Sequence, residues 1–144
     1  MKIALIELGN LNGELYPDVT MGWHNHGLVM LATILKKQGI EFDYINLKEL
    51  SHFNLLIDKL SIGYDTIAIS IMSSDYQQAV ELIDGIKRNW PKTKIVVGGI
   101  ATTVSPQGFI DNPDVDFIIQ GEGEMSFLEL LRDGLAGSYK PVKG

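Results

Sequence analysis

The sequence predicts an α/β protein built on a five-stranded parallel sheet. Short runs of apolar and β-branched residues alternate with longer segments whose apolar residues recur at helical spacing. This alternation is typical of parallel sheets with helices on both faces. Glycines follow two of the runs directly, as expected where a buried strand turns into a loop. A chain of 144 residues is long enough to bury its own core in one domain.

The N-terminal third contains two expected strands and one helix. Residues 2–8 (KIALIEL) form a short apolar run, which predicts a central strand. Residues 9–26 are rich in Gly and Asn and are expected to form a long loop over the binding edge of the sheet. Apolar residues at helical spacing predict a helix over 27–38, which Gly39 ends. The mixed polarity of residues 41–47 predicts an edge strand.

The middle of the chain repeats the same alternation. A helix is expected over residues 52–60, followed by a strand over 66–71 (TIAISI) that is apolar on both faces. The next helix is expected to extend to Trp90. Ser74, with Gln77 three residues later, is a candidate capping box at its start.

The C-terminal part adds two strands and two helices. Residues 95–97 and 117–119 are short buried strands. A short helix is expected near 106–111, and a last helix near 125–135 with apolar residues along one side. Residues 138–144 are expected to start a linker toward a C-terminal domain that the chain does not contain.

The domain is therefore expected to cover residues 1–137. Two strand orders are open, the flavodoxin-like 2-1-3-4-5 and the Rossmann-like 3-2-1-4-5. The polar second strand suits an edge, which favours 2-1-3-4-5.

Composition excludes several functions. The chain has no cysteine, so it holds no disulfide, thiolate nucleophile or cysteine-ligated cluster. The net charge is −6 and no stripe of Lys or Arg occurs, which disfavours nucleic-acid binding. No apolar run is long enough for a membrane span, and the cytoplasm is the expected location. The G-x-S-x-G elbow, the P-loop and the G-x-G-x-x-G fingerprint are all absent.

The most informative residues follow the expected strands. Gly98-Gly99 and the Gly121–Glu124 segment (GEGE) each follow a strand, and Ser70 lies near the end of another. The carboxyl ends of parallel strands meet at one edge, where open α/β sheets bind ligands. Two successive glycines form either a tight β-α connection or a slot that a ligand enters. Ser70 is a candidate hydrogen-bonding partner for that ligand.

Other polar residues have ordinary interpretations. His24 and His26 are metal-ligand candidates, but their spacing does not place them on one helix face, and solvated loop histidines are the simpler interpretation. Glu122 and Glu124 flank a glycine and are expected to diverge. Glu124 suits the first turn of the last helix, where the dipole favours negative charge.

In this order and spacing, these residues resemble the cobalamin-binding domain found at the N-terminus of B12-dependent radical SAM enzymes. Ser70-Ile71-Met72 is similar to the family's S-x-L element, and Gly98-Gly99 to its G-G element. The segment VDFIIQGEGEMSFLELL resembles the family's G-E-G-E segment, and GLVMLATILKKQGIEFDYINL its first helix and second strand. The resemblance covers nearly the whole chain.

The resemblance implies roles for individual residues. Cobalamin would place its corrin ring over the carboxyl edge and its nucleotide tail in the slot. Ser70 would hydrogen-bond the tail, and Gly98 and Gly99 would make room for it. The implied cofactor-binding residues are Gly9, Asn10, Ser70, Met72, Ser73, Gly98, Gly99, Ile100, Ala101, Gly121, Glu122 and Gly123. A bulky Gly99→Trp substitution is expected to abolish corrinoid retention without unfolding the domain.

Two features depart from the wider family. The D-x-H-x-x-G motif that supplies a cobalt-ligating histidine is absent, which leaves His24 or His26 as weak candidates for cobalt. The chain also lacks the radical SAM core, so S-adenosylmethionine and a 4Fe-4S cluster would belong to a domain outside it. The chain alone is expected to be non-catalytic. Two alternatives stay open: the same fold used for docking or substrate gating without cobalamin, and a small flavodoxin-like or glycosyltransferase-like nucleotide-binding protein.

Overall fold

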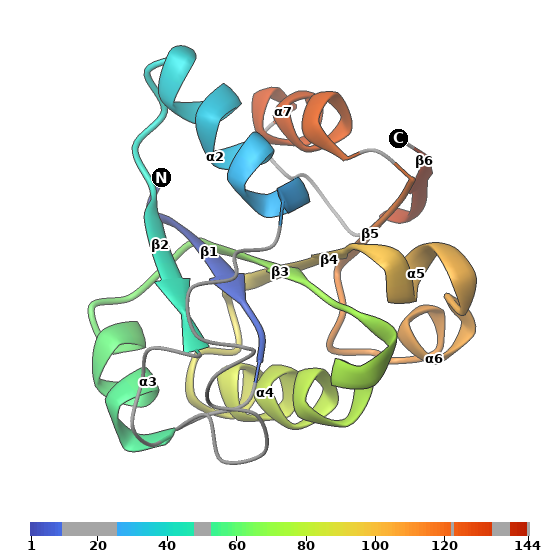
Figure 1. Cartoon of the computed structure of the whole chain (residues 1–144). Coiled ribbons are helices and arrows are strands. Elements are labelled where there is room, and N and C mark those ends of the chain that lie inside the picture. Colours follow the sequence, from blue (N-terminus) through green and yellow to red (C-terminus); the bar gives the residue numbers. More distant parts are fainter. Residues whose placement is uncertain (10–25, 48–52, 122, 134–138, 144) are drawn as a thin grey trace, which may run out of the picture.

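A parallel sheet with helices on both faces forms the protein (Figure 1). The computed structural model describes residues 1–9, 26–47, 53–121, 123–133 and 139–143. Within these ranges, the strands are β1 (Ile3–Glu7), β2 (Asp43–Asn46), β3 (Thr66–Ser70), β4 (Lys94–Gly98), β5 (Phe117–Gln120) and β6 (Tyr139–Lys143). The helices are α2 (His26–Lys37), α3 (Phe53–Leu60), α4 (Tyr76–Asn89), α5 (Ile100–Val104), α6 (Gln107–Ile110) and α7 (Glu124–Arg132), with a 3-10 turn, η3, over Ser73–Asp75.

The strand order is β2-β1-β3-β4-β5-β6, and every described pair is parallel. This confirms the flavodoxin-like order for the first five strands. The polar β2 lies at one edge, while β1 is central and buried along its whole length. The register aligns Glu7 with Ser70 and Ser70 with Gly98, so the ends of three strands lie level at the carboxyl edge.

Two elements differ from the sequence-based expectation. Tyr139–Lys143, within the stretch expected to start a linker, forms a sixth strand, β6, which pairs with β5. An outer strand tolerates the proline and lysines of this segment because only one of its sides needs a hydrogen-bonding partner. In addition, α5 begins directly after Gly99, where the sequence pattern predicts no helix.

The expected capping box at Ser74 is also wrong. Ser74 lies inside η3, and α4 begins two residues later at Tyr76. The carboxylate of Asp75 accepts a hydrogen bond from the Met72 N–H at 3.3 Å, so Asp75 stabilises this turn instead. Gln77 pairs with Glu81 along the helix.

The two faces of the sheet are covered by different helices. Figure 1 shows α2 and α7 on one side and α3 and α4 on the other. The core between the sheet and α3 to α6 contains Leu56, Ile83, Ala101, Phe109 and Val97. The core beneath α2 and α7 contains Leu31, Leu35, Val96, Phe117 and Phe127. Within the described residues, no helix combines the length and apolar character needed to cross a bilayer.

Candidate functional site

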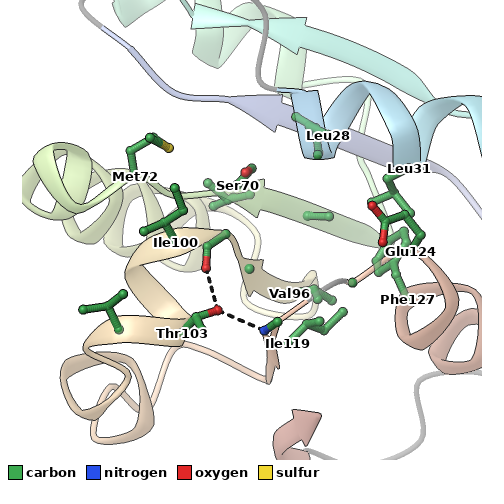
Figure 2. A pocket seen from close by; sticks show the side chains of 18 residues that line it. Leu28, Leu31, Ser70, Met72, Val96, Ile100, Thr103, Ile119, Glu124 and Phe127 are labelled. Carbon is green, nitrogen blue, oxygen red and sulfur yellow. Dashed lines mark hydrogen bonds between the residues drawn. The ribbon is translucent and has the colours of Figure 1, made fainter. Parts of the chain in front are cut away.

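A pocket of about 760 Å³ opens at the carboxyl edge of the sheet (Figure 2). It lies on the α2 and α7 side, over the ends of β3, β4 and β5, and α5 forms part of its mouth. Its volume lies in the range of small-molecule sites, roughly 300–1,000 Å³. The pocket therefore occupies the place where sheets of this kind bind ligands.

The floor of the pocket consists of alternate residues on adjacent strands. Ala68 and Ser70 come from β3, and Val96 and Gly98 from β4. The register pairs Ala68 with Val96 and Ser70 with Gly98. Because alternate residues of a strand point to the same face, this register brings small side chains together under the opening.

Gly98 leaves space that the chain itself does not need. A Cβ at this position would meet only the carbonyl oxygen of Ile119 at 3.7 Å and its Cβ at 3.9 Å, which are ordinary contacts. Its φ is not positive, so the backbone does not require glycine either. Glycine inside a strand costs roughly 0.5–1 kcal/mol relative to alanine. The absence of a side chain at Gly98 therefore enlarges the pocket, and the packing of the domain does not require it.

Gly99, by contrast, is required by the fold. Its φ is 102°, and a Cβ would lie 2.7 Å from the carbonyl oxygen and 2.8 Å from the nitrogen of Ile71. This close approach places the Ile71 carbonyl to accept the Ala101 N–H at 3.0 Å. The expectation that Gly99→Trp would spare the fold is therefore wrong, because any side chain at this position meets the main chain of Ile71, the residue directly after β3. At Gly98, by contrast, a larger side chain would enter the pocket without meeting the main chain.

Two threonines of α5 connect the glycine turns, as the dashed lines in Figure 2 show for Thr103. The Thr103 hydroxyl donates to the Gly99 carbonyl at 3.2 Å and accepts the Gly121 N–H at 2.9 Å. The buried Thr102 hydroxyl lies 2.9 Å from the carbonyl oxygens of both Gly99 and Ile119, and donates its proton to one at a time. These contacts fix the loop after β4 against the loop after β5. Sequence reasoning missed both roles, because they depend on a helix that the pattern does not predict.

The mouth of the pocket is apolar and exposed. Met72, Ile100 and Val104 line it with 41%, 52% and 69% of their surface exposed. Glu124, in the first turn of α7, is the one charged side chain among the described lining residues. No lysine or arginine belongs to that lining set. The site is consequently suited to a large, mostly apolar ligand and not to one held by its phosphate charge.

Seven of the residues that the sequence predicts for cofactor binding lie together around this pocket. They are Ser70, Met72, Gly98, Gly99, Ile100, Gly121 and Gly123.

The other predicted positions are placed elsewhere or fall outside the described residues. Ala101 is buried in the core on the α4 side of the sheet. Gly9 is not among the described lining residues, and its N–H donates to Gln78 Oε1 at 3.2 Å. Asn10, His24 and Glu122 lie outside the described residues, as do the side chains of Ser73 and His26.

A second polar cluster lies beside the pocket, at the end of β1. Glu7 is 1% exposed, and the Tyr44 hydroxyl donates a hydrogen bond to its carboxylate. Sequence reasoning missed this pair. Within the described part of the chain, no group of three or more His, Cys, Asp or Glu side chains is arranged to hold a metal ion.

Another hollow, of about 720 Å³, opens at the amino edge of the sheet. Charged residues of both signs line it, among them Lys2, Lys36, Glu41 and Asp43. It lies at the opposite edge from Ser70 and the glycine turns, and no predicted site residue that the structure describes borders it.

The family model for the B12 binding domain matches residues 18–131. The chain therefore belongs to the B12-binding domain family. It is 30% identical over 83 residues to the cobalamin-dependent radical SAM methyltransferase TokK of Streptomyces tokunonensis, a match that covers 56% of the chain and 12% of TokK. The chain thus spans about an eighth of that relative.

Solved structures show the same fold. The cobalamin-dependent S-adenosylmethionine radical enzyme OxsB, with aqua-cobalamin bound, superposes with a TM-score of 0.76 and 22% identity, over 93% of this chain and 19% of OxsB. A cobalamin-binding protein from Desulfitobacterium hafniense gives a TM-score of 0.62 and 15% identity, over 91% of this chain and 57% of that one. The chain is a B12-binding domain similar to those of cobalamin-dependent radical SAM enzymes.

Proposed function

We propose that this domain holds cobalamin by placing the nucleotide tail in the pocket beneath α2 and α7 and the corrin ring over the apolar mouth. The observation that carries the proposal is Gly98, a strand glycine whose missing side chain only the pocket uses. The pocket is open and lies at the Ser70 end of the sheet, as a tail-binding slot requires.

The residues present fit such a group. Gly98 and Ala68 leave room along the floor, and Ser70 supplies a hydroxyl beside them. Gly121 and Gly123 border the far side, and Met72 and Ile100 present apolar surface at the mouth. When bound, cobalamin supplies cobalt-based chemistry. The residues of this chain bind and orient the cofactor and exclude water from the tail.

We further propose that the domain works in cis with a radical SAM core, which would carry S-adenosylmethionine and a 4Fe-4S cluster. The much longer TokK and OxsB support this arrangement. In such a protein the domain itself is not catalytic, and its operation in the cytoplasm is part of the same proposal. His24 and His26 stay candidates for the lower cobalt ligand.

The two alternatives fit the site less well. A docking or gating domain without cobalamin has no need for a hollow that costs strand stability at Gly98. The glycines before α5 and α7 resemble the helix starts that bind phosphates, but a protein that holds a nucleotide by its phosphates is also expected to present a lysine or arginine to them. The described lining residues provide no cation.

The experiment is a titration of the purified chain with hydroxocobalamin, followed by its absorbance and by co-elution in gel filtration. We expect the corrinoid to be retained, and retention to fall through the series Gly98→Ala, Gly98→Val and Gly98→Leu. Val97→Ile is the matched control, because Val97 precedes Gly98 but faces the opposite core. Absence of retained corrinoid at high micromolar concentration, or equal retention by Gly98→Leu, would overturn the proposal.

A further inference from the structure

Glu124 brings a carboxylate into a pocket whose other walls are mainly apolar. It lies in the first turn of α7 and is the one charged side chain among the described lining residues. Figure 2 shows its carboxylate beside Leu31, which comes from α2, and Phe127, which lies one turn further along α7. Both neighbours are buried, with 9% and 1% of their surface exposed. The acid group therefore lies where a ligand in the pocket would meet it.

The Glu124 carboxylate has no partner within the part of the chain that the structure describes. No described N–H, hydroxyl or cation donates a hydrogen bond to it. Glu7 differs in this respect, since its carboxylate accepts a hydrogen bond from the Tyr44 hydroxyl. Arg132, at the far end of the same helix as Glu124, donates to the Gln38 side chain. The Glu124 carboxylate thus keeps its capacity to accept hydrogen bonds from a ligand.

The helix dipole does not explain why this acid faces the pocket. A negative charge is favoured throughout the first turn of a helix, by about 0.3–1 kcal/mol. Met125, the next residue of that turn, is 58% exposed, so an acid there would gain the same benefit while surrounded by water. The turn instead exposes its methionine and directs its glutamate into the pocket, which reverses the usual pattern of a surface helix. This reversal favours a ligand-binding role for Glu124.

A bound ligand changes the surroundings of this carboxylate. Glu124 is half-buried, so water reaches its carboxylate while the pocket is empty. A ligand that fills the pocket displaces this water, and an ionised acid that loses its hydrogen bonds there is strongly disfavoured. The Thr103 hydroxyl is already committed, because it donates its proton to the Gly99 carbonyl. The ligand itself is therefore expected to bring a donor to this side of the pocket.

We infer that Glu124 positions the nucleotide tail of the corrinoid by accepting hydrogen bonds from its ribose hydroxyls. The inference rests on the proposed function. Dimethylbenzimidazole has no N–H once it is joined to its sugar, and the phosphodiester oxygens only accept. The ribose hydroxyls are the donors that remain in the tail. Hydrogen bonds to an ionised group are roughly twice as strong as those between neutral groups, so this contact would orient the tail more firmly than a neutral hydroxyl such as that of Ser70.

The experiment measures the affinity of the whole 144-residue chain for hydroxocobalamin and for cobinamide, which lacks the nucleotide, by equilibrium titration. A hydrogen bond to a charged group corresponds to roughly 10- to 150-fold in affinity. We expect Glu124→Leu to weaken cobalamin binding by this factor. Glu124→Gln should weaken it only severalfold, because its amide oxygen still accepts. Neither variant should change the affinity for cobinamide, because cobinamide brings no ribose.

A further ligand and a control variant assign the contact to the sugar. Cobalamin that is methylated on its ribose hydroxyls no longer donates, so we expect the wild-type chain and Glu124→Leu to bind it equally. Glu129→Leu makes the same change in charge on the exposed side of α7, outside the described lining residues, and should leave all three affinities unchanged. Thermal unfolding shows whether each variant is folded, and Glu124→Gln carries the test if Glu124→Leu is not.

The possible failures of this inference and of the proposed function are distinguishable. Equal losses of cobalamin and cobinamide binding in Glu124→Leu would overturn the inference alone, because they would assign Glu124 to the corrin or to the shape of the pocket. Unchanged or tighter cobalamin binding by Glu124→Leu, or an equal effect of Glu129→Leu, would overturn it as well. A wild-type chain that binds no corrinoid, or that binds cobinamide as tightly as cobalamin, would overturn the proposed function and this inference with it.

Discussion

The two faces of the sheet are filled differently, although the same strands form both. On β4, Ile95 and Val97 face the α4 side, where they belong to a continuous cluster of buried apolar side chains. Val96 and Gly98 face the α2 and α7 side, where a pocket of about 760 Å³ remains. The comparison separates two tasks: the α4 face stabilises the fold, and the α7 face gives up packing to leave room for a ligand.

The largest expected effect comes from replacing a buried phenylalanine on each face of the sheet by alanine. Phe109, on α6, and Phe127, on α7, are 0% and 1% exposed and lie on opposite faces. Phe109→Ala should lower the free energy of unfolding by about 3–5 kcal/mol. Phe127→Ala should cost at least about 1 kcal/mol less, because the space that the ring leaves opens into the pocket instead of forming a closed cavity. Urea denaturation of the ligand-free variants measures both, and equal losses would remove the distinction between the faces.

The neighbouring glycines sharpen the comparison. Gly99→Ala should destabilise the protein by at least about 1–3 kcal/mol, because a side chain at φ 102° is strained and its Cβ meets Ile71. Gly98→Ala should be neutral or stabilise the ligand-free protein by up to about 1 kcal/mol. Thermal unfolding of the two variants side by side is the measurement. A Gly98→Ala variant as unstable as Gly99→Ala would show that the fold needs both glycines.

A smaller effect is expected from the threonine that connects the two glycine turns. Thr103→Val removes the hydroxyl between Gly99 and Gly121, at a cost of about 0.5–1.5 kcal/mol. It should also weaken cobalamin binding severalfold, because the mouth is less well ordered before the ligand arrives. Thr33→Val is the control, since this exposed α2 hydroxyl donates to the Val29 carbonyl of its own helix. Equal cobalamin affinity for both variants would assign Thr103 a local role only.

The smallest effect concerns a hydroxyl on the α4 face. Burial, and then the hydrogen bond that Tyr64 donates to Asp43 at 2.6 Å, raise the pKa of Tyr64 above its usual range. Since the folded-state pKa is the higher one, the hydroxyl contributes its stability below about pH 10 and loses it as the pH rises further. Tyr64→Phe should therefore cost about 1 kcal/mol at pH 7 and less above pH 10. Denaturation of both proteins across this range measures the gap, and a gap that widens with pH would contradict the assignment.

The sequence predicted the parts of the fold that depend on local pattern. Residues 66–71 and 95–97 are apolar runs, which are typical of strands buried on both faces, and the polar second strand indicated the edge. The segment YKPVK gave no such signal, because its proline and lysines are equally typical of a linker, and only its pairing with β5 makes it a strand.

The sequence predicted the glycines of the candidate site, but it did not predict the hydrogen bonds that hold the loops of the site together. Gly98, Gly99 and Gly121 were identified because glycine after a strand is conspicuous. Ile100–Val104 is rich in β-branched residues, which have low helix propensity, so α5 and the bridging role of Thr103 were missed. The sequence also could not separate Gly98 from Gly99, because their difference depends on distant residues: Gly99 lies against the main chain of Ile71, whereas Gly98 has only ordinary contacts with Ile119.

The space above Gly98 has a consequence for attempts to increase the stability of this domain. A directed-evolution campaign that rewards heat resistance in the empty protein would favour larger residues at this position, since a strand gains from them. Variants selected in this way would be more stable, but their pocket would no longer have room for a ligand.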